Sequence, residues 1–304
     1  MEKYAAIDLG TNTFHLLIAS FNEEGRLIEH FRRREYIHLA KDGIERISQE
    51  AYNKALTCVQ QFATDLEHFE ISHISCSGTA ALRTASNGLS LVHEIENCLK
   101  VKVDVIDGIT EAKYIYQGVK LAVPDLKEGN HLIMDIGGGS VEFIVIKSGH
   151  FVWSNSYPIG IAVLRRQFHK SEPITRDEIM MINQFIRDHI AKLLYLCRDT
   201  KFTSLIGASG SFEVLSKMAS DQDEALQMDV PISSFLDFYE EIVSASLDER
   251  LSREDIPKDR AQLIVVAFQL IKYMLSQLKI DKIIVSKYAM KEGMLSNFLD
   301  ASKN

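Results

Sequence analysis

Two segments of the chain share a pattern of aspartate, glycine and small polar residues that is suited to binding phosphate. Residues 7–18 and residues 134–145 both read apolar, Asp, apolar, Gly, followed by three small or polar residues and an apolar strand. A tight turn made of Gly, Thr, Asn and Ser can direct several backbone N–H groups and hydroxyls at one point. Each segment is therefore a candidate phosphate-binding hairpin.

The residues of the two hairpins divide into candidate phosphate donors and candidate metal ligands. An aspartate at the end of the incoming strand can hold Mg²⁺ or its waters against a bound phosphate, because carboxylate oxygen is a hard ligand. The predicted ligands of a Mg²⁺ cofactor are Asp8 and Asp135. The predicted phosphate-binding residues of the turns are Gly10, Thr11, Asn12, Thr13, Gly137, Gly138, Gly139 and Ser140.

A purely structural interpretation competes with this one, since Asp and Gly serve hairpin turns in proteins of every function. A single copy would favour the structural interpretation. Two copies with matched flanking strands favour a duplicated architecture, although a duplication establishes architecture before activity. Two other phosphate-binding motifs are excluded, because G-x-G-x-x-G would need a glycine at Glu142 and G-x-x-x-x-G-K-[ST] does not occur.

The elements that must position these residues alternate between strands and helices, and the order restarts after a linker at residues 124–130. Predicted strands cover residues 3–7, 14–20, 73–77, 101–106, 131–134 and 141–147. Predicted helices begin at Ser48, cover residues 87–99 and 110–122, follow a Thr175/Glu178 capping box, and run from Pro257 to Leu278. The expected fold is α/β with two duplicated halves, residues 1–124 and 125–304.

Other candidate residues lie near predicted helix starts. Glu111 follows Gly108 and is suited either to the helix dipole or to catalysis. Arg83 follows a strand-to-helix turn and is either a solvated helix residue or a bidentate phosphate ligand. Glu142 alternates with apolar neighbours beside the second turn, and this pattern alone is compatible with a solvent-facing residue. A further candidate anion site at a helix N-terminus comprises Gly207, Ser209 and Gly210.

Composition is that of a globular protein of about two domains, and it excludes disordered, collagen-like and coiled-coil classes. The 304 residues carry a formal charge of −8, which disfavours a nucleic-acid partner. Residues 221–256 hold eleven acidic and two basic residues, a balance of −9, so the remaining chain carries +1. The acidic segment is interpreted as a solvated helix face with a loop, and the remaining chain, which includes both hairpins, is about neutral.

Cysteine spacing and hydropathy indicate the cellular compartment in which the protein is expected to act. The four cysteines lie far apart without a C-x-x-C motif, which fits a reducing cytoplasm. The richest apolar stretch, residues 263–275, is interrupted by Gln269 and Lys272 and is too short for a membrane span. The first residues lack the features of a secretory leader. The expectation is a cytoplasmic protein without a membrane partner.

The paired hairpins resemble the two phosphate motifs of the actin-like ATPase superfamily, and within it the chain closely resembles the exopolyphosphatase and guanosine pentaphosphate phosphohydrolase family. The resemblance rests on residues 6–18, 78–83, 106–113 and 135–142, with weaker matches at 158–165, 207–211 and 291–293. It implies two ribonuclease-H-like lobes with an interlobe cleft, and a homodimer. It also implies Mg²⁺-dependent release of orthophosphate from polyphosphate or guanosine pentaphosphate.

The resemblance assigns roles within the candidate site. Glu111 corresponds to the catalytic base, Arg83 to a phosphate clamp, and Glu142 to a second acid near metal and water. The segment 207–211 has fewer glycines and threonines than the family pattern, which leaves nucleotide binding open. Two arginine clusters, residues 32–34 and 165–166, are candidate basic rails for a long anion. A kinase of the same superfamily and a non-catalytic sensor of phosphorylated nucleotides remain alternative functions.

Overall fold

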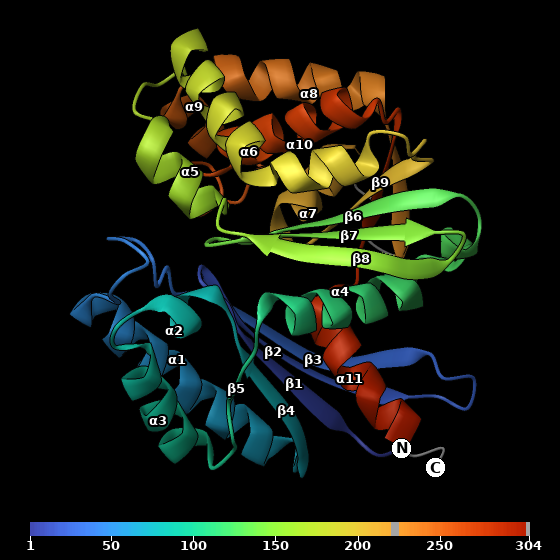
Figure 1. The fold of residues 1–304 in the computed structure, drawn as a ribbon. Helices are drawn as coiled ribbons and strands as arrows, with labels where there is room; N and C mark the ends of the chain where they lie inside the picture. Colours follow the sequence, from blue (N-terminus) through green and yellow to red (C-terminus); the bar gives the residue numbers. More distant parts are fainter. Residues whose placement is uncertain (220–224, 302–304) are drawn as a thin grey trace. The chain divides into compact units, whose positions relative to one another are not determined.

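Two mixed β-sheets organise the part of the chain that the structure describes, residues 1–219 and 225–301 of a computed structural model (Figure 1). The first sheet has the order β3-β2-β1-β4-β5, in which β1, β2 and β3 are antiparallel and β4 and β5 run parallel to β1. Its strands are β1 (Tyr4–Leu9), β2 (Thr13–Phe21), β3 (Leu27–Tyr36), β4 (His73–Gly78) and β5 (Asp104–Val105).

The second sheet has the order β10-β11-β9-β6-β7-β8. Its strands β6, β7 and β8 are antiparallel, β9 and β11 run parallel to β6, and β10 closes the far edge antiparallel to β11. Its strands are β6 (Asn130–Ile136), β7 (Val141–Lys147), β8 (His150–Tyr157), β9 (Ser204–Ala208), β10 (Gln227–Pro231) and β11 (Lys282–Ser286).

The predicted duplication is confirmed at the level of strand order. In each sheet a hairpin leads to a third antiparallel strand on one side and to parallel strands on the other. The register makes individual positions correspond: Asp8 pairs with His15 across the first hairpin, and Asp135 pairs with Glu142 across the second. The α/β fold therefore consists of two ribonuclease-H-like units, each built around one of the two sequence motifs.

Helices cover the first sheet and bury its apolar face. The longest, α1, begins after Ser48, whose side chain caps the helix by accepting a hydrogen bond from the Ala51 N–H, as predicted. Buried residues of α1 and α3 pack with the inward residues of β1 and β2 in one core. The helices of this unit are α1 (Gln49–His68), α2 (Ala80–Thr84), α3 (Gly88–Leu99), α4 (Gly108–Ala122) and α11 (Met290–Ala301).

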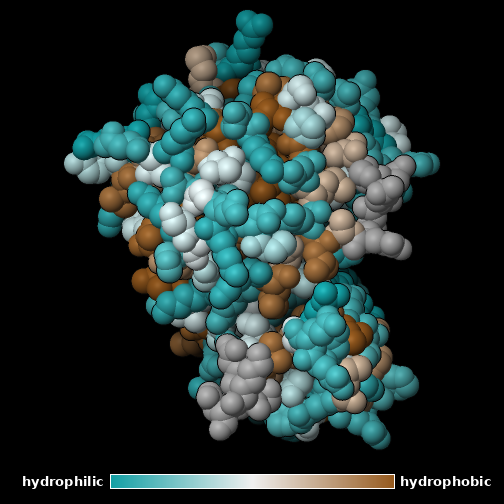
Figure 2. All heavy atoms as spheres, turned by 90° about the vertical axis from the view of Figure 1, so that its right-hand side faces the viewer, coloured by the Kyte–Doolittle hydropathy of each residue, from teal (hydrophilic) through white to brown (hydrophobic). Residues whose placement is uncertain are grey.

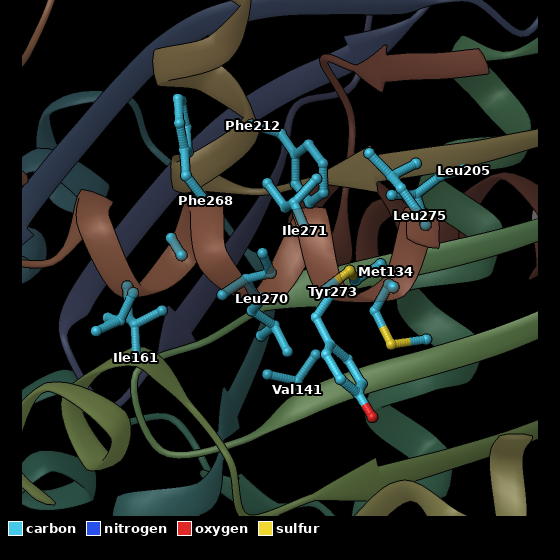
Figure 3. Close-up of a cluster of buried hydrophobic side chains, with 14 of the residues drawn as sticks. Met134, Val141, Ile161, Leu205, Phe212, Phe268, Leu270, Ile271, Tyr273 and Leu275 are labelled. Atoms are coloured by element: carbon cyan, nitrogen blue, oxygen red, sulfur yellow. The ribbon is translucent and has the colours of Figure 1, made fainter. Parts of the chain in front are cut away.

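Helix α10 lies in the centre of the second unit's core, with eleven of its fifteen residues buried. In Figure 3, Leu270 and Ile271 of this helix project among side chains from the sheet and from α7, including Val141 and Phe212. The helices of this unit are η1 (Pro124–Lys127), α5 (Ile161–Phe168), α6 (Arg176–Cys197), α7 (Gly210–Ala219), α8 (Ile232–Ser244), α9 (Leu247–Ser252) and α10 (Ile264–Leu278).

The predicted start of α10 at Pro257 is wrong, because the helix begins at Ile264. Residues 257–263 form tight turns instead, in which the Arg260 N–H bonds to the Pro257 carbonyl at 2.8 Å. The carbonyl of Ala261 accepts a hydrogen bond from Nε of the buried Arg250 at 2.8 Å. The Arg250 side chain thus binds a carbonyl of the turn, and a local sequence pattern does not reveal a contact of this kind.

The compact units differ from the predicted domains at the C-terminal end. The first unit comprises Met1–Leu121, Gly137–Gly139 and Tyr288–Asn304, and the second comprises Ala122–Ile136 and Ser140–Lys287. Helix α11 thus returns to the first sheet, where Phe298 stacks on Tyr4 with ring centroids 4.9 Å apart. Of the acidic segment 221–256, residues 221–224 lie outside the described residues.

One face of the protein can be judged for polarity. On the face drawn in Figure 2, hydrophilic residues predominate and hydrophobic ones are interspersed among them. None of the helices in the described part of the chain combines the length and apolar character that a bilayer crossing requires.

Helices α4 and α11 cross at two glycines. A Cβ atom at Gly118 would overlap the Ala289 carbonyl, and one at Gly293 would overlap the Tyr114 carbonyl. Backbone atoms cannot rotate away as a side chain can, so the helices would have to separate. We expect Gly118→Ala to lower the free energy of unfolding by about 1–3 kcal/mol, measured by urea denaturation. Lys120→Ala, an exposed change on the same helix, is the control.

The predicted capping box at the start of α6 is confirmed. The Glu178 carboxylate accepts hydrogen bonds from the backbone N–H groups of Lys170, Ser171 and Thr175, at 2.7, 2.9 and 2.8 Å. Burial raises the pKa of Glu178, but these bonds, that of Thr175 foremost, outweigh burial and lower the pKa to about 2. The carboxylate therefore stabilises the fold only while it is ionised.

We therefore predict that the free energy of unfolding of the wild type and that of Glu178→Gln differ by an amount that depends on pH. The wild type should be more stable by up to about 3 kcal/mol above pH ~4.5, and the difference should shrink as the pH falls from ~4.5 towards ~2. Denaturant unfolding of both proteins at several pH values measures it. A difference that stays constant down to pH ~2.5 would contradict the role of the ionised carboxylate.

Candidate active site

The first glycine turn joins β1 to β2 and is held from one side. The Thr11 carbonyl accepts a hydrogen bond from the Leu39 N–H at 2.8 Å, and the Asn12 carbonyl accepts one from the Ile37 N–H at 2.8 Å. In a planar trans peptide the N–H points opposite to the preceding carbonyl. The N–H groups of Asn12 and Thr13 are therefore directed away from residues 37–39, as an anion cradle requires.

The second glycine turn joins β6 to β7, and its three glycines group with the first unit. A Cβ atom at Gly138 would overlap the Asn12 side chain, and a Cβ atom at Gly139 would lie 3.1 Å from Thr11 Oγ1. Glycine leaves room for this close approach, whereas a side chain at Gly138 would displace that of Asn12. The contacts explain why this turn carries glycines where the first has Thr11 and Asn12, and they place the two predicted phosphate turns against each other.

Arg83 and Glu111 come together in the first unit. Arg83 Nη1 lies 3.7 Å from Glu111 Oε2 and also donates a hydrogen bond to the Ile106 carbonyl. Glu111 lies in the first turn of α4 and is 7% exposed. The arginine and the helix dipole both favour the ionised carboxylate. The two residues thus form one charged pair rather than two independent sites.

The neighbouring Asp107 fixes the start of α4. Its Oδ1 accepts a hydrogen bond from the Thr110 N–H at 2.8 Å. This bond, with the nearby charge of Arg83, keeps the pKa of Asp107 below its usual value. Because Asp107 anchors the first turn of the helix, it also orients Glu111 one residue beyond Thr110.

Asp135 and Glu142 form the acidic pair of the second unit. They lie directly opposite each other on β6 and β7, and they are 7% and 1% exposed. Two hydroxyls donate to Glu142 Oε1, Ser140 Oγ at 2.8 Å and Ser156 Oγ at 2.6 Å. The burial excludes the interpretation of Glu142 as a solvent-facing residue. Sequence reasoning missed Ser156, which lies on β8, a strand that the pattern analysis did not predict.

The turn between β9 and α7 lies next to this pair, because Asp135 is the parallel neighbour of Ala208. Ser209 adopts a left-handed backbone conformation, with φ 71°. A Cβ atom at Gly207 would overlap the Phe212 ring, and one at Gly210 would overlap the Arg260 guanidinium. Packing therefore accounts for both glycines. Arg260, which is 8% exposed, lies beside the start of α7. The sequence analysis had placed this arginine inside the predicted helix 257–278.

The structure distributes the predicted site residues over the two units. The first unit contains Asp8, Gly10, Thr11, Asn12, Thr13, Arg83, Glu111, Gly137, Gly138 and Gly139. The second contains Asp135, Ser140, Glu142, Gly207, Ser209 and Gly210. Asp8 pairs in the sheet register with His15 and with Ser77 of β4, at the position that corresponds to Asp135.

Several arginines of the two predicted basic rails form ion pairs or hydrogen bonds within the fold. Arg32 Nη2 bonds to Glu29 and to the buried Glu292 at 2.8 and 2.9 Å, and Arg33 Nε bonds to Asp65 at 2.6 Å. Arg165 donates to the His169 carbonyl. These ion pairs and hydrogen bonds argue against a continuous basic track along either cluster.

The described residues contain no group of three or more His, Cys, Asp and Glu side chains arranged to hold a metal ion. Mg²⁺ is commonly bound by only one or two carboxylates together with phosphate oxygens and water. The buried carboxylate of Asp135, next to that of Glu142, provides the hard oxygen donors that such a cation needs. The donor chemistry fits Mg²⁺ and leaves most of its coordination to substrate and water.

Two ribonuclease-H-like units with glycine turns at equivalent hairpins define a protein of the actin-like ATPase fold. Residues 23–302 match the Ppx/GppA phosphatase family, and the chain belongs to this family. An exopolyphosphatase structure from Cytophaga hutchinsonii is 32% identical, covers 99% of this chain and 98% of its own, and superposes with a TM-score of 0.94. A family member from Aquifex aeolicus is 21% identical with a TM-score of 0.83, covering 100% and 99% of the two chains, and supports the fold.

Relatives by sequence carry two different names. A guanosine-5'-triphosphate,3'-diphosphate pyrophosphatase of Aliivibrio fischeri is 25% identical over 98% of this chain and 59% of its own. A putative exopolyphosphatase of Haemophilus influenzae is 25% identical over 97% of this chain and 91% of its own. The chain thus spans about three fifths of the length of the first relative and most of the second.

Proposed function

We propose that the protein hydrolyses the terminal phosphoanhydride of inorganic polyphosphate, of guanosine pentaphosphate, or of both, and releases orthophosphate. The observation that carries the proposal is the Arg83–Glu111 pair, which lies in the same unit as both glycine turns. Membership of a phosphatase family and the names of the relatives support the same reaction class.

The phosphate end is bound by the glycine turns and Arg83. The backbone N–H groups of the turns, including those of Asn12 and Thr13, donate to phosphate oxygens, and the planar guanidinium of Arg83 adds charge. Donors that are held in place before substrate arrives cost little reorganisation in the transition state. In phosphoryl transfer, positioning and charge stabilisation supply most of the catalysis.

Glu111 acts as general base. It takes a proton from the attacking water while the water oxygen bonds to the terminal phosphorus and the bridging P–O bond breaks, so the products are orthophosphate and a chain shorter by one phosphate. The nearby guanidinium favours the ionised form of Glu111, which is the form that accepts that proton. Glu142 is the second acid near the water. Mg²⁺, for which Asp8 and Asp135 are the predicted ligands, would neutralise phosphate charge when bound.

The remaining expectations belong to the same proposal. We expect the protein to act in the cytoplasm as a homodimer, without a nucleic-acid or membrane partner. Sedimentation velocity on the purified chain measures the oligomeric state.

Glu111→Gln tests the proposed base. The amide is isosteric but accepts no proton, so phosphate release should fall by about 10²–10⁴-fold in kcat. The measurement is colorimetric detection of orthophosphate with Mg²⁺ present. Glu94→Gln, an exposed change on α3, is the matched control. Near wild-type release by Glu111→Gln would refute the mechanism, and substrate binding by the wild type without hydrolysis would favour the sensor alternative.

A substrate panel tests the assignment of substrate class. Release should be substantial with long polyphosphate, short polyphosphate or guanosine pentaphosphate, and much lower with ATP. The segment 207–211 has fewer glycines and threonines than the family pattern, which weighs against an adenosine site there. Equal or faster turnover of ATP would overturn the substrate assignment, and transfer of the phosphoryl group to an acceptor would favour the kinase alternative.

A further inference from the structure

Glu142 is held by two side-chain hydroxyls that converge on one of its oxygens. Ser140 Oγ donates to Glu142 Oε1 at 2.8 Å, and Ser156 Oγ donates to the same oxygen at 2.6 Å. Ser140 lies two residues before Glu142 in the chain, and Ser156 lies directly opposite it on β8. The carboxylate is therefore fixed from its own strand and from the neighbouring strand.

We propose that Ser140 and Ser156 are positioning residues for Glu142, and that the Ser140 hydroxyl serves this carboxylate rather than the substrate phosphate. The inference rests on the proposed function, in which Glu142 is the second acid. A hydroxyl has a single proton to donate. While Ser140 donates it to Glu142, phosphate contacts at the second turn come from backbone N–H groups instead.

The duplicated sheet shows that this arrangement is not required by the fold. In the first unit the position of Glu142 is taken by His15, and the position of Ser156 is taken by Arg34, its partner on β3. The two hairpins nevertheless pair their strands in the same order. The same hairpin thus forms with other residue types at the positions of Glu142 and Ser156. The Ser–Glu–Ser arrangement is specific to the second unit and is not needed to form the hairpin.

The geometry also favours a role in orientation. Glu142 is 1% exposed, and a buried carboxylate needs hydrogen-bond donors to remain charged. Neutral hydroxyls provide them without cancelling the charge, as an arginine would. Removing one donor should leave the carboxylate buried but free to adopt another rotamer. Such a change affects the reaction more than the binding of substrate.

Ser156→Ala is the test, with Ser154→Ala as the matched control. Ser154 is two residues away on the same face of β8, opposite Ile144. We expect Ser156→Ala to lower kcat about tenfold with little change in KM, Ser154→Ala to leave both within about twofold, and Ser156→Thr, which keeps the hydroxyl, to restore most of kcat. In a Glu142→Gln background, Ser156→Ala should change kcat by less than about twofold, because the group on which it acts is already altered.

Several results would overturn the proposal. One is an equal loss of kcat from Ser156→Ala in the wild-type and Glu142→Gln backgrounds. The others are a loss of kcat in Ser154→Ala as large as that in Ser156→Ala, and an unchanged kcat in Ser156→Ala. If Ser156→Ala does not fold, the same cycle is run with Ser140→Ala and Ser140→Thr.

A second measurement separates this proposal from the proposed function. If the wild type releases no phosphate from any substrate, the function proposal fails. The positioning role is then judged from crystal structures of the wild type and Ser156→Ala. A displaced Glu142 carboxylate in the variant supports the role, and an unmoved one refutes it.

Discussion

The antiparallel register of the two hairpins is the constraint from which the candidate site follows. In each hairpin the strand order and the turn length decide which residues face each other. In the second hairpin this brings Asp135 opposite Glu142, and in the first it brings Asp8 opposite His15. A shift by one residue would turn each acid to the other face of its sheet.

The turns of these hairpins show how glycine serves contact between backbone segments. Gly138 and Gly139 admit the side chains of Asn12 and Thr11, so the two phosphate-type turns can touch. The same device recurs where α4 crosses α11, at Gly118 and Gly293. In both places a group far away in the chain lies where a side chain would otherwise be.

Buried or half-buried charged groups in this protein lie beside partners that offset the cost of burying them. Arg83 lies beside Glu111, two hydroxyls bond to Glu142, three backbone N–H groups bond to Glu178, and Arg32 bonds to Glu292. Only some of these pairs belong to the candidate site. The arginines of residues 32–34 and 165 show the other outcome, in which a basic cluster that suggested a substrate track mainly supports the fold. A charged residue that is buried on folding loses hydration, and a partner within the fold must compensate for that loss. A cluster of charged residues in a sequence is therefore weak evidence of a ligand-binding site.

Local chemistry allowed the sequence by itself to determine the duplicated hairpins, the α/β class and the capped starts of α1 and α6, and the resemblance of its motifs indicated the family. Turn residues, period-two strands and capping boxes act over a few residues, so their signals survive without tertiary context. The tertiary structure alone decided the late start of α10, the return of α11 to the first unit, and the contact of Ser156 with Glu142. Each depends on a contact between distant residues, such as Arg250 with Ala261 or Ser156 with Glu142. Local periodicity carries no information about such contacts.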